Sequence, residues 1–283
     1  MVATPIGNLA DITLRALHVL QLVDAIACED TRHTQTLLRA YGMDRPHQQL
    51  IALHQHNETE AAQGVIARLQ AGQRVAFVSD AGTPAISDPG ARLVAATRSA
   101  GRPVVPLPGA SSVTTALSAA GIVNTGSSDT GFVFAGFLPS KSAERTSAVM
   151  ALSGETRGVV LLEAPHRIES LAQALAVLGQ RPVTIGRELT KQFEEIATVC
   201  AADFAGWLTR DANRVRGEFV LVLHPVADAG QTQDEAALRT LKLLLAELPL
   251  KTAVKLAAEI TGSARNVLYE TALALKQDGA EDT

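Results

Sequence analysis

The first part of the chain alternates short apolar runs with longer segments whose apolar residues recur at helical spacing. The apolar runs predict strands over residues 2–6, 25–28, 50–53, 75–78 and 104–107. The longer segments predict helices over residues 11–22, 33–41, 58–70, 91–100 and 111–120. Strands that alternate with helices imply right-handed crossovers and a mostly parallel sheet with helices on both faces.

The pattern changes after residue 120. A segment rich in Gly, Ser, Thr and Asp over residues 121–131 is typical of a linker. Beyond it, strands are predicted over residues 132–135, 158–162, 183–185, 195–199 and 218–223. Several of these follow one another with little helix between them, so the second sheet should be mixed or partly antiparallel.

A second break, over residues 229–234, precedes a tail of three predicted helices over residues 235–248, 250–260 and 264–276. Gly262 separates the last two, as in a helix-turn-helix hairpin. The predicted division is an α/β domain, a second α/β domain and a helical tail, over residues 1–122, 130–226 and 232–283. Acidic residues slightly outnumber basic ones in the tail, so docking on protein and insertion into an RNA groove both stay open.

Composition describes a globular protein, with 283 residues of which 47% are hydrophobic and 19% charged. The net charge of −4 argues against a general nucleic-acid binder, although Lys and Arg slightly outnumber Asp and Glu between residues 139 and 191. No apolar run has the length of a membrane span, and no secretory signal is visible. Cys28 and Cys200 are the two cysteines and lack metal-ligand spacing, so a reduced, cytoplasmic setting is expected.

The loop after the strand at 75–78 carries the densest candidate chemistry. Loops at the carboxyl ends of parallel strands are where open α/β sheets bind their ligands. In this one, Asp80 and Asp88 would repel a phosphate, whereas Gly82 lets a ligand approach the backbone closely. The loop therefore suits a neutral or cationic ligand that carries hydroxyls or an amine.

The glycine spacing excludes the two common nucleotide-phosphate loops. No two of the 21 glycines are separated by a single residue, so the dinucleotide fingerprint is absent, and the Walker A loop is absent too. Three other loops follow predicted strands, over residues 4–8, 80–84 and 106–112. One such loop alone reads as a tight connection with an N-cap serine, but three at the ends of successive strands indicate a ligand site.

Characteristic motifs then follow one another over nearly the whole chain, at residues 2–9, 29–34, 79–90, 106–111, 165–167, 187–191 and 217–221. Together they closely resemble the ribosomal RNA small-subunit methyltransferase I family, which belongs to the tetrapyrrole-methylase-like (class III) methyltransferases. The resemblance implies a two-domain α/β fold with a mostly parallel first sheet, a mixed second sheet and S-adenosylmethionine in the cleft between the domains. It also implies a homodimer that methylates the ribose 2′-hydroxyl of a cytidine in the decoding region of 16S ribosomal RNA, at the position corresponding to nucleotide 1402.

The chemistry of the three loops fits this cofactor. Asp80 can accept hydrogen bonds from its ribose or amine, and the backbone at Gly82 and Thr83 can approach its adenosyl part. Ser111 and Ser112, beside the free N–H groups of a helix start, suit its carboxylate or adenine edge. With the rim residues implied by the resemblance, the expected cofactor-binding residues are Pro5, Gly7, Asp80, Ala81, Gly82, Thr83, Pro84, Pro108, Gly109, Ser111 and Ser112.

Methyl transfer to a hydroxyl depends on its alignment with the methyl donor, with a base assisting late. The candidate bases or orienting groups are Asp30, Glu163, His166 and Glu188. Guanidinium and ammonium groups bind RNA phosphates, with ordinary surface charge as the alternative. The candidates for phosphate binding are Arg32, Arg167, Arg187 and Lys191. His54 and His56 share one strand face, but no third ligand follows, so no metal site is expected.

The chain departs from the family pattern at two places. Family members usually carry several apolar residues ahead of the strand at 2–6, so we expect the natural chain to begin upstream of Met1. Ala164 stands where a serine is more usual before Pro165, a change that we expect to be tolerated.

Two other functions stay open at this point. One is a tetrapyrrole methyltransferase with the same fold and cofactor, and the other is a non-catalytic ribosome assembly factor that keeps the cleft as a scaffold. The basic motifs at 165–167 and 187–191 and the tail hairpin favour RNA over a tetrapyrrole. The intact cofactor loops argue against the scaffold.

Overall fold

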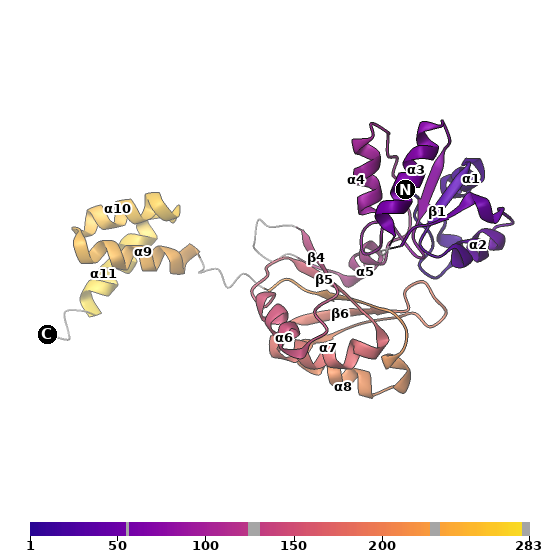
Figure 1. Cartoon of the computed structure of the whole chain (residues 1–283). Coiled ribbons are helices and arrows are strands. Elements are labelled where there is room, and N and C mark those ends of the chain that lie inside the picture. The colour runs from indigo at the N-terminus through magenta and orange to yellow at the C-terminus, as the bar shows by residue number, and fades with distance from the viewer. Residues whose placement is uncertain (55–56, 124–130, 227–232, 279–283) are drawn as a thin grey trace. The chain divides into compact units, whose positions relative to one another are not determined.

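The computed structural model describes residues 1–54, 57–123, 131–226 and 233–278, which fall into two compact units (Figure 1). Residues 1–123 and 131–225 form one unit, which holds two sheets. The tail helices form the other unit. Most of the linker predicted at 121–131 and of the break predicted at 229–234 lies outside the described residues.

The first part of the larger unit, residues 1–111, is called the N lobe here and contains a parallel sheet in the order β2-β1-β3. Its strands and helices are β1 (Ala25–Cys28), β2 (Leu50–Ala52), β3 (Val75–Val78), α1 (Leu14–Leu22), α2 (Thr31–Ala40), α3 (Glu58–Gln70) and α4 (Ala91–Ser99). Successive strand residues face opposite sides, so Ile26 packs with α1 and α2, whereas Ala27 packs with α3 and α4. Helices therefore cover both faces of the sheet, as the sequence predicts.

The prediction of full strands at residues 2–6 and 104–107 is wrong. These segments form isolated bridges instead, with Val2 parallel to Leu107 and Thr4 antiparallel to Gly82. Proline has no N–H to donate to a ladder, and the first segment contains Pro5 while prolines recur at every second or third position in and around the second. The N lobe therefore has three regular strands, and the two proline-bearing segments lie beside them.

The rest of the larger unit, residues 112–225, is called the C lobe and contains a five-stranded sheet in the order β4-β5-β8-β6-β7. Its strands are β4 (Phe132–Gly136), β5 (Gly158–Glu163), β6 (Pro182–Arg187), β7 (Glu195–Cys200) and β8 (Phe219–Leu223). Its helices are α5 (Ser112–Ala120), α6 (Ser142–Ala151), α7 (Ile168–Leu175) and α8 (Phe204–Thr209). β4 pairs parallel with β5, while β5 with β8, β8 with β6 and β6 with β7 are antiparallel. The prediction of a mixed second sheet is confirmed.

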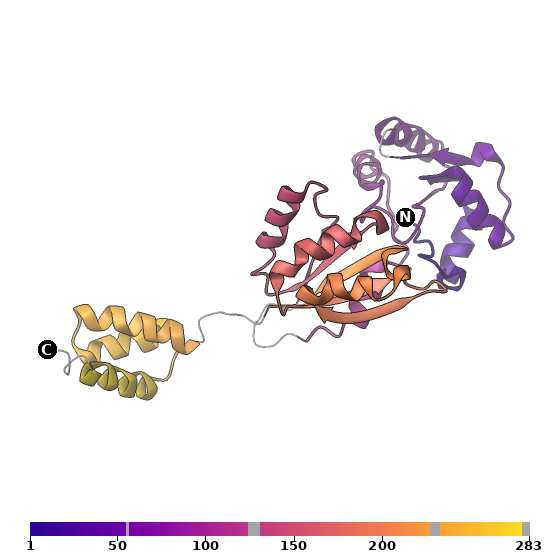
Figure 2. The same cartoon turned by 90° about the horizontal axis from the view of Figure 1, so that it is seen from below.

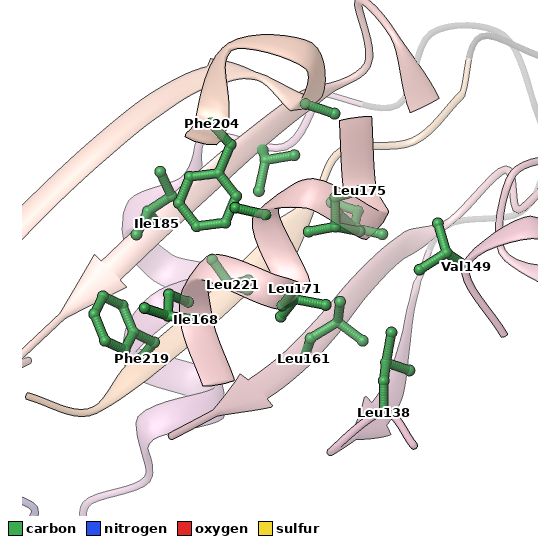
Figure 3. Packing of buried hydrophobic residues seen from close by; sticks show 14 of the residues in the cluster. Leu138, Val149, Leu161, Ile168, Leu171, Leu175, Ile185, Phe204, Phe219 and Leu221 are labelled. Carbon is green, nitrogen blue, oxygen red and sulfur yellow. The ribbon is translucent and has the colours of Figure 1, made fainter. Parts of the chain in front are cut away.

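The C-lobe sheet is buried on both faces by different helices. Figure 2, seen from below, shows α6, α7 and α8 in front of the strands. On that face Leu161 and Leu221 pack against Ile168 and Leu171 of α7 (Figure 3). On the other face Val160, with its neighbours on β8, packs against α5. Alternate residues of the central strands thus serve two cores, which fixes the strand register because a slip of one residue would exchange the two faces.

The tail unit consists, within its described residues, of α9 (Gln233–Glu247), α10 (Leu250–Thr261) and α11 (Arg265–Asp278). These match the predicted helices to within two residues at each end. Its core is a small cluster made of Ala237, Leu241, Val254, Ala257, Leu268 and Ala272. Short 3-10 turns complete the described structure, at Leu9–Asp11, His47–Gln49, Pro165–Arg167, Ala176–Leu178, Ala201–Asp203 and Ala212–Val215. Within the described part of the chain, every helix is too short or too polar to cross a bilayer.

Candidate functional site

A cavity of about 380 Å³ lies between the two lobes of the larger unit. Loops after N-lobe strands form one wall, and the ends of C-lobe strands form the other. The described residues that line it are Ile6, Ala81, Gly82, Thr83, Ile86, Ser87, Asp88, Ser111, Ser112, Val113, Phe137, Leu162, Glu163, Ala164, Pro165, Leu189, Glu218, Phe219 and Val220. The cavity therefore has a mixed lining, with an apolar majority and a few hydroxyls and carboxylates.

The three loops that the sequence groups together lie side by side at this cavity. Thr4 and Gly82 exchange two backbone hydrogen bonds, both with an N···O distance of 3.0 Å. The hydroxyl of Thr83 donates to the carbonyl of Ala110 over 2.9 Å, which ties the second loop to the third. Gly82 has a φ of +77°, and a Cβ there would lie 3.2 Å from Cγ2 of Ile6. The wall therefore presents backbone at Gly82, where a side chain would be strained and crowded.

The N-terminus of α5 supplies hydrogen-bond donors to the same cavity. Ser111 is the N-cap residue, and its hydroxyl makes no capping hydrogen bond to the helix. The first N–H groups of a helix lack intrahelical acceptors and carry partial positive charge. Because Ser111 and Ser112 line the cavity, this end of α5 suits a carboxylate or a hydrogen-bond acceptor.

Carboxylates beside the second loop give the N-lobe wall a negative character. Burial, together with the charge of Asp80, raises the pKa of Asp88, which lines the cavity. Burial and the charges of Asp80 and Asp88 raise the pKa of Glu29 as well. Asp80 itself accepts the backbone N–H of Asp30 over 3.2 Å and holds the loop to the end of β1. Repulsion among these groups favours a cationic ligand, which would relieve it.

Glu163, at the end of β5, lines the C-lobe wall of the cavity and is only 2% exposed. Its Oε1 accepts the N–H of Ala164 over 2.9 Å and lies 3.0 Å from Nε of Arg167. Its Oε2 has no hydrogen-bond partner among the described residues. A buried carboxylate oxygen without a partner is costly unless a ligand or a water satisfies it.

The other three candidate bases lie outside the described lining of the cavity. Asp30 is the N-cap of α2, and its hydrogen bonds with Arg32 lower its pKa to about 2. His166 is exposed in the 3-10 turn after β5. Burial opposes ionisation of Glu188, but hydrogen bonds from Lys191 and from the N–H of Glu218 outweigh it and lower its pKa. Of the four candidate bases, Glu163 is therefore the one that belongs to the described lining of the cavity.

The four candidate phosphate-binding residues differ in what they hold. Arg32 is exposed and pairs with Asp30. Lys191 Nζ bonds Oε1 of Glu188 over 2.9 Å and Oε2 of Glu218 over 3.0 Å.

The remaining two are directed into the protein. Arg167 donates to the carbonyl of Leu138 as well as pairing with Glu163. Arg187 is buried and donates to the carbonyls of Arg216 and Phe193, at 2.8 and 3.1 Å. These two arginines hold loops of the C lobe, whereas Arg32 faces solvent.

The predicted cofactor residues outside the described lining support the loops that form it. Gly7 lies so close to the loop after β6 that a Cβ would fall 2.5 Å from Cγ of Lys191. A Cβ at Gly109 would fall 2.7 Å from that of Ala3. The others in this class are the buried Pro5 and Pro84, the half-buried Asp80 and the exposed Pro108.

Several lining residues are not among the site residues predicted from the sequence. Ile86, Ser87 and Asp88 lie within the motif at 79–90, and Glu218 to Val220 within the motif at 217–221, so the resemblance could have included them. Phe137 lies in no such motif, and only the tertiary structure brings it to the cavity. Among the described residues no group of His, Cys, Asp and Glu has the arrangement of a metal site, and His56 lies outside that set.

Comparison with known proteins identifies families and solved structures that this chain resembles. Residues 1–205 match the model of the Tetrapyrrole (Corrin/Porphyrin) Methylases, and residues 231–276 match that of the RsmI C-terminal HTH domain. Among solved structures, a cobalt precorrin-4 methyltransferase has a TM-score of 0.56 at 18% identity and covers 79% of this chain and 92% of its own. A uroporphyrin-III C-methyltransferase from Thermus thermophilus, complexed with S-adenyl homocysteine, has a TM-score of 0.50 at 17% identity, with 79% and 95% covered. These likenesses show the fold.

Curated relatives are much closer in sequence. A ribosomal RNA small subunit methyltransferase I from Escherichia coli O157:H7 is 50% identical over 275 residues, which is 96% of this chain and 93% of that protein. One of the same name from Pseudomonas aeruginosa is 50% identical over 277 residues, with 96% and 95% covered. With the fold, the tail and half of all residues shared over nearly the full length of both chains, the chain belongs to the ribosomal RNA small subunit methyltransferase I family.

Proposed function

We propose that the protein transfers a methyl group from S-adenosylmethionine to the ribose 2′-hydroxyl of a cytidine in 16S ribosomal RNA, within the small ribosomal subunit. One observation carries the proposal: half of the residues are identical to relatives named as methyltransferases of small-subunit ribosomal RNA. We further propose that it acts in the cytoplasm as a homodimer. Its α/β domains, over 1–122 and 130–226, would enclose the cofactor, with the tail over 232–283 as a separate domain.

The lining of the cavity fits this cofactor. The backbone at Gly82 leaves room that a side chain would fill, which suits the adenosyl part. Ser111, Ser112 and the first N–H groups of α5 would hold the carboxylate. The negative wall around Asp88 favours the sulfonium and the ammonium. Bound there, S-adenosylmethionine would supply an electrophilic methyl group.

We assign acceptance of the hydroxyl proton to Asp88. Both Asp88 and Glu163 line the cavity, but Glu163 is buried and engaged through Oε1, whereas Asp88 is half-buried and has a side-chain hydrogen bond with Ser79. The raised pKa of Asp88 brings its basicity closer to neutral pH, where a general base is most effective. Glu163 would then act as a fixed hydrogen-bond acceptor toward the ligand.

Transfer of labelled methyl groups tests the proposal. The purified protein is incubated with labelled S-adenosylmethionine and either small subunits from cells that lack this family's enzyme or a porphyrinogen. Label in the ribose of a 16S cytidine is the expected result. Label in the porphyrinogen would instead establish the tetrapyrrole methyltransferase, and no label in either would favour the assembly factor.

A further inference from the structure

Phe137 is an exposed aromatic residue on the wall of the cavity. It is 55% exposed, and Ile86, which lines the cavity from the N lobe, is 53% exposed. Among the other lining residues Gly82, Val113 and Phe219 are buried, whereas Ser87, Pro165 and Glu218 are polar or small residues that are exposed as well. The two exposed apolar side chains therefore mark the open end of the cavity, and the glycine loop and α5 mark its enclosed end.

The backbone before Phe137 turns this side chain out of the sheet. The register of β4 against β5 shifts between Phe134 and Gly136, an irregularity of the kind that a β-bulge produces. Gly136 then adopts a φ of +63°, in the left-handed region that favours glycine. Bulges re-aim the side chains that follow them and are common beside active sites. Phe137 therefore leaves the alternation that would have sent it into one of the two cores.

The backbone after Phe137 is held by two arginines. Arg145, which is 5% exposed, donates to the carbonyls of Pro139 and Ser140 over 3.0 and 2.6 Å. Arg167 donates to the carbonyl of Leu138 and is itself held by Glu163. Three successive carbonyls are thus fixed by buried or half-buried guanidinium groups. Phe137 is presented to the cavity on a rigid support.

We infer that Phe137 stacks on the base of the nucleotide whose ribose is methylated, an inference that rests on the proposed function. With the cofactor held at the enclosed end, the ribose can reach its methyl group only if the nucleotide is splayed out of the RNA, and the unstacked base then lies toward the open end. Splayed bases are held on aromatic side chains in single-stranded RNA recognition. A half-exposed phenyl ring at the open end, followed by a backbone whose carbonyls are held, supplies such a face.

The test compares variants at Phe137 with one at Phe132. Phe132 begins β4, the strand that Phe137 follows, is 47% exposed and is not among the lining residues of the cavity, so Phe132→Ala is a matched control for loss of an exposed phenyl ring. Methylation kinetics on small subunits that lack the modification give KM for the subunit, and calorimetry gives Kd for S-adenosylmethionine. Thermal melting checks that each variant is folded.

Phe137→Ala is expected to raise KM for the subunit about tenfold with Kd for S-adenosylmethionine unchanged, in line with the loss of one base–aromatic stack. Phe137→Tyr should have the KM of the wild-type protein. Phe137→Leu should have the raised KM of Phe137→Ala, because leucine keeps apolar bulk without a π face. An unchanged KM in Phe137→Ala, full restoration by leucine, or a weakened Kd for S-adenosylmethionine would overturn the assignment. If the wild-type protein places no label in ribose, the proposed function fails first and the assignment falls with it.

Discussion

A side chain at Gly82 would be strained in two ways. A residue with Cβ pays about 1–2 kcal/mol for a left-handed backbone, and here the new Cβ would also lie 3.2 Å from Ile6 in the cavity wall. We expect Gly82→Ala to weaken S-adenosylmethionine binding at least tenfold and to lower stability by that amount, measured by calorimetry and urea unfolding. Gly101 has a similar φ of +70° with no atom within 4 Å of the place that a Cβ would take, so Gly101→Ala should lose stability alone. Equal cofactor affinities in the two variants would contradict the placement of Gly82 at the cofactor.

The ionised carboxylate of Asp88, which we propose as the base, has a cost in stability. Its pKa is raised by burial and by Asp80, so the folded protein prefers the protonated form relative to the unfolded chain. The stability that Asp88 contributes is therefore fully present below the unfolded pKa of about 3.9 and is lost as pH rises through the higher folded value. At neutral pH the wild-type protein bears the full cost of the buried charge.

Asp88→Asn should consequently raise Tm at about pH 7 and much less at about pH 4, while lowering kcat at least tenfold. The acid limb of the wild-type pH–rate profile should have an apparent pKa above the usual value for an aspartate, and this limb should disappear in the variant. Asp203, an exposed N-cap residue of α8 whose side chain makes no capping hydrogen bond, offers the control Asp203→Asn, which should leave kcat unchanged and change Tm only slightly at either pH. A variant at Asp88 with wild-type kcat would remove its assignment as the base.

At the scale of elements, buried and half-buried arginine side chains hold the backbone that follows β4. Arg145→Met removes donors from two carbonyls and from the hydroxyl of Ser170, which Nη1 of Arg145 bonds over 2.5 Å. Leaving buried acceptors unpaired should lower the free energy of unfolding by about 3 kcal/mol in urea titrations. KM for the small subunit should also rise, since Phe137 loses its support. Arg210→Met, at an exposed position, should change neither quantity, and an unchanged KM in folded Arg145→Met would show that the loop holds without this arginine.

Most elements are predicted correctly from the sequence. The exceptions are two segments that contain proline and lie beside the N-lobe sheet. Apolar runs at 25–28, 75–78 and 218–223 became buried strands, because burial on both faces demands continuous apolar residues. The segments at 2–6 and 104–107 have similar apolar content but form only bridges. Hydrophobicity predicts that a segment is buried, whereas ladder formation also requires a free N–H at each paired position.

At the scale of the whole molecule, the two units have separate cores. The described core of the tail, around Leu241 and Val254, shares no residue with the clusters of the two lobes. A core as small as that of the tail gives only marginal stability. Differential scanning calorimetry of the intact chain should therefore show two transitions, the weaker one belonging to the tail.

A chain that ends at residue 226 should keep the stronger transition and its Kd for S-adenosylmethionine, because the described lining of the cavity lies entirely within the larger unit. The full-length chain measured under the same conditions is the control. A single transition in the full-length chain, or loss of cofactor binding in the shortened one, would mean that the two units are coupled.

The sequence by itself determined the family, the α/β class of both lobes, the helical tail and the three loops that lie together at the cavity. These follow from local periodicity, turn chemistry and contiguous motifs, which do not depend on contacts between distant residues. Only the tertiary structure decided which polar groups face the cavity and which are engaged elsewhere. Arg187 is a predicted phosphate-binding residue whose donors hold two carbonyls in the structure, and Phe137 follows a shift in the register of β4. Such roles depend on which partner saturates each donor and where a side chain is directed, and both are set by contacts across the fold.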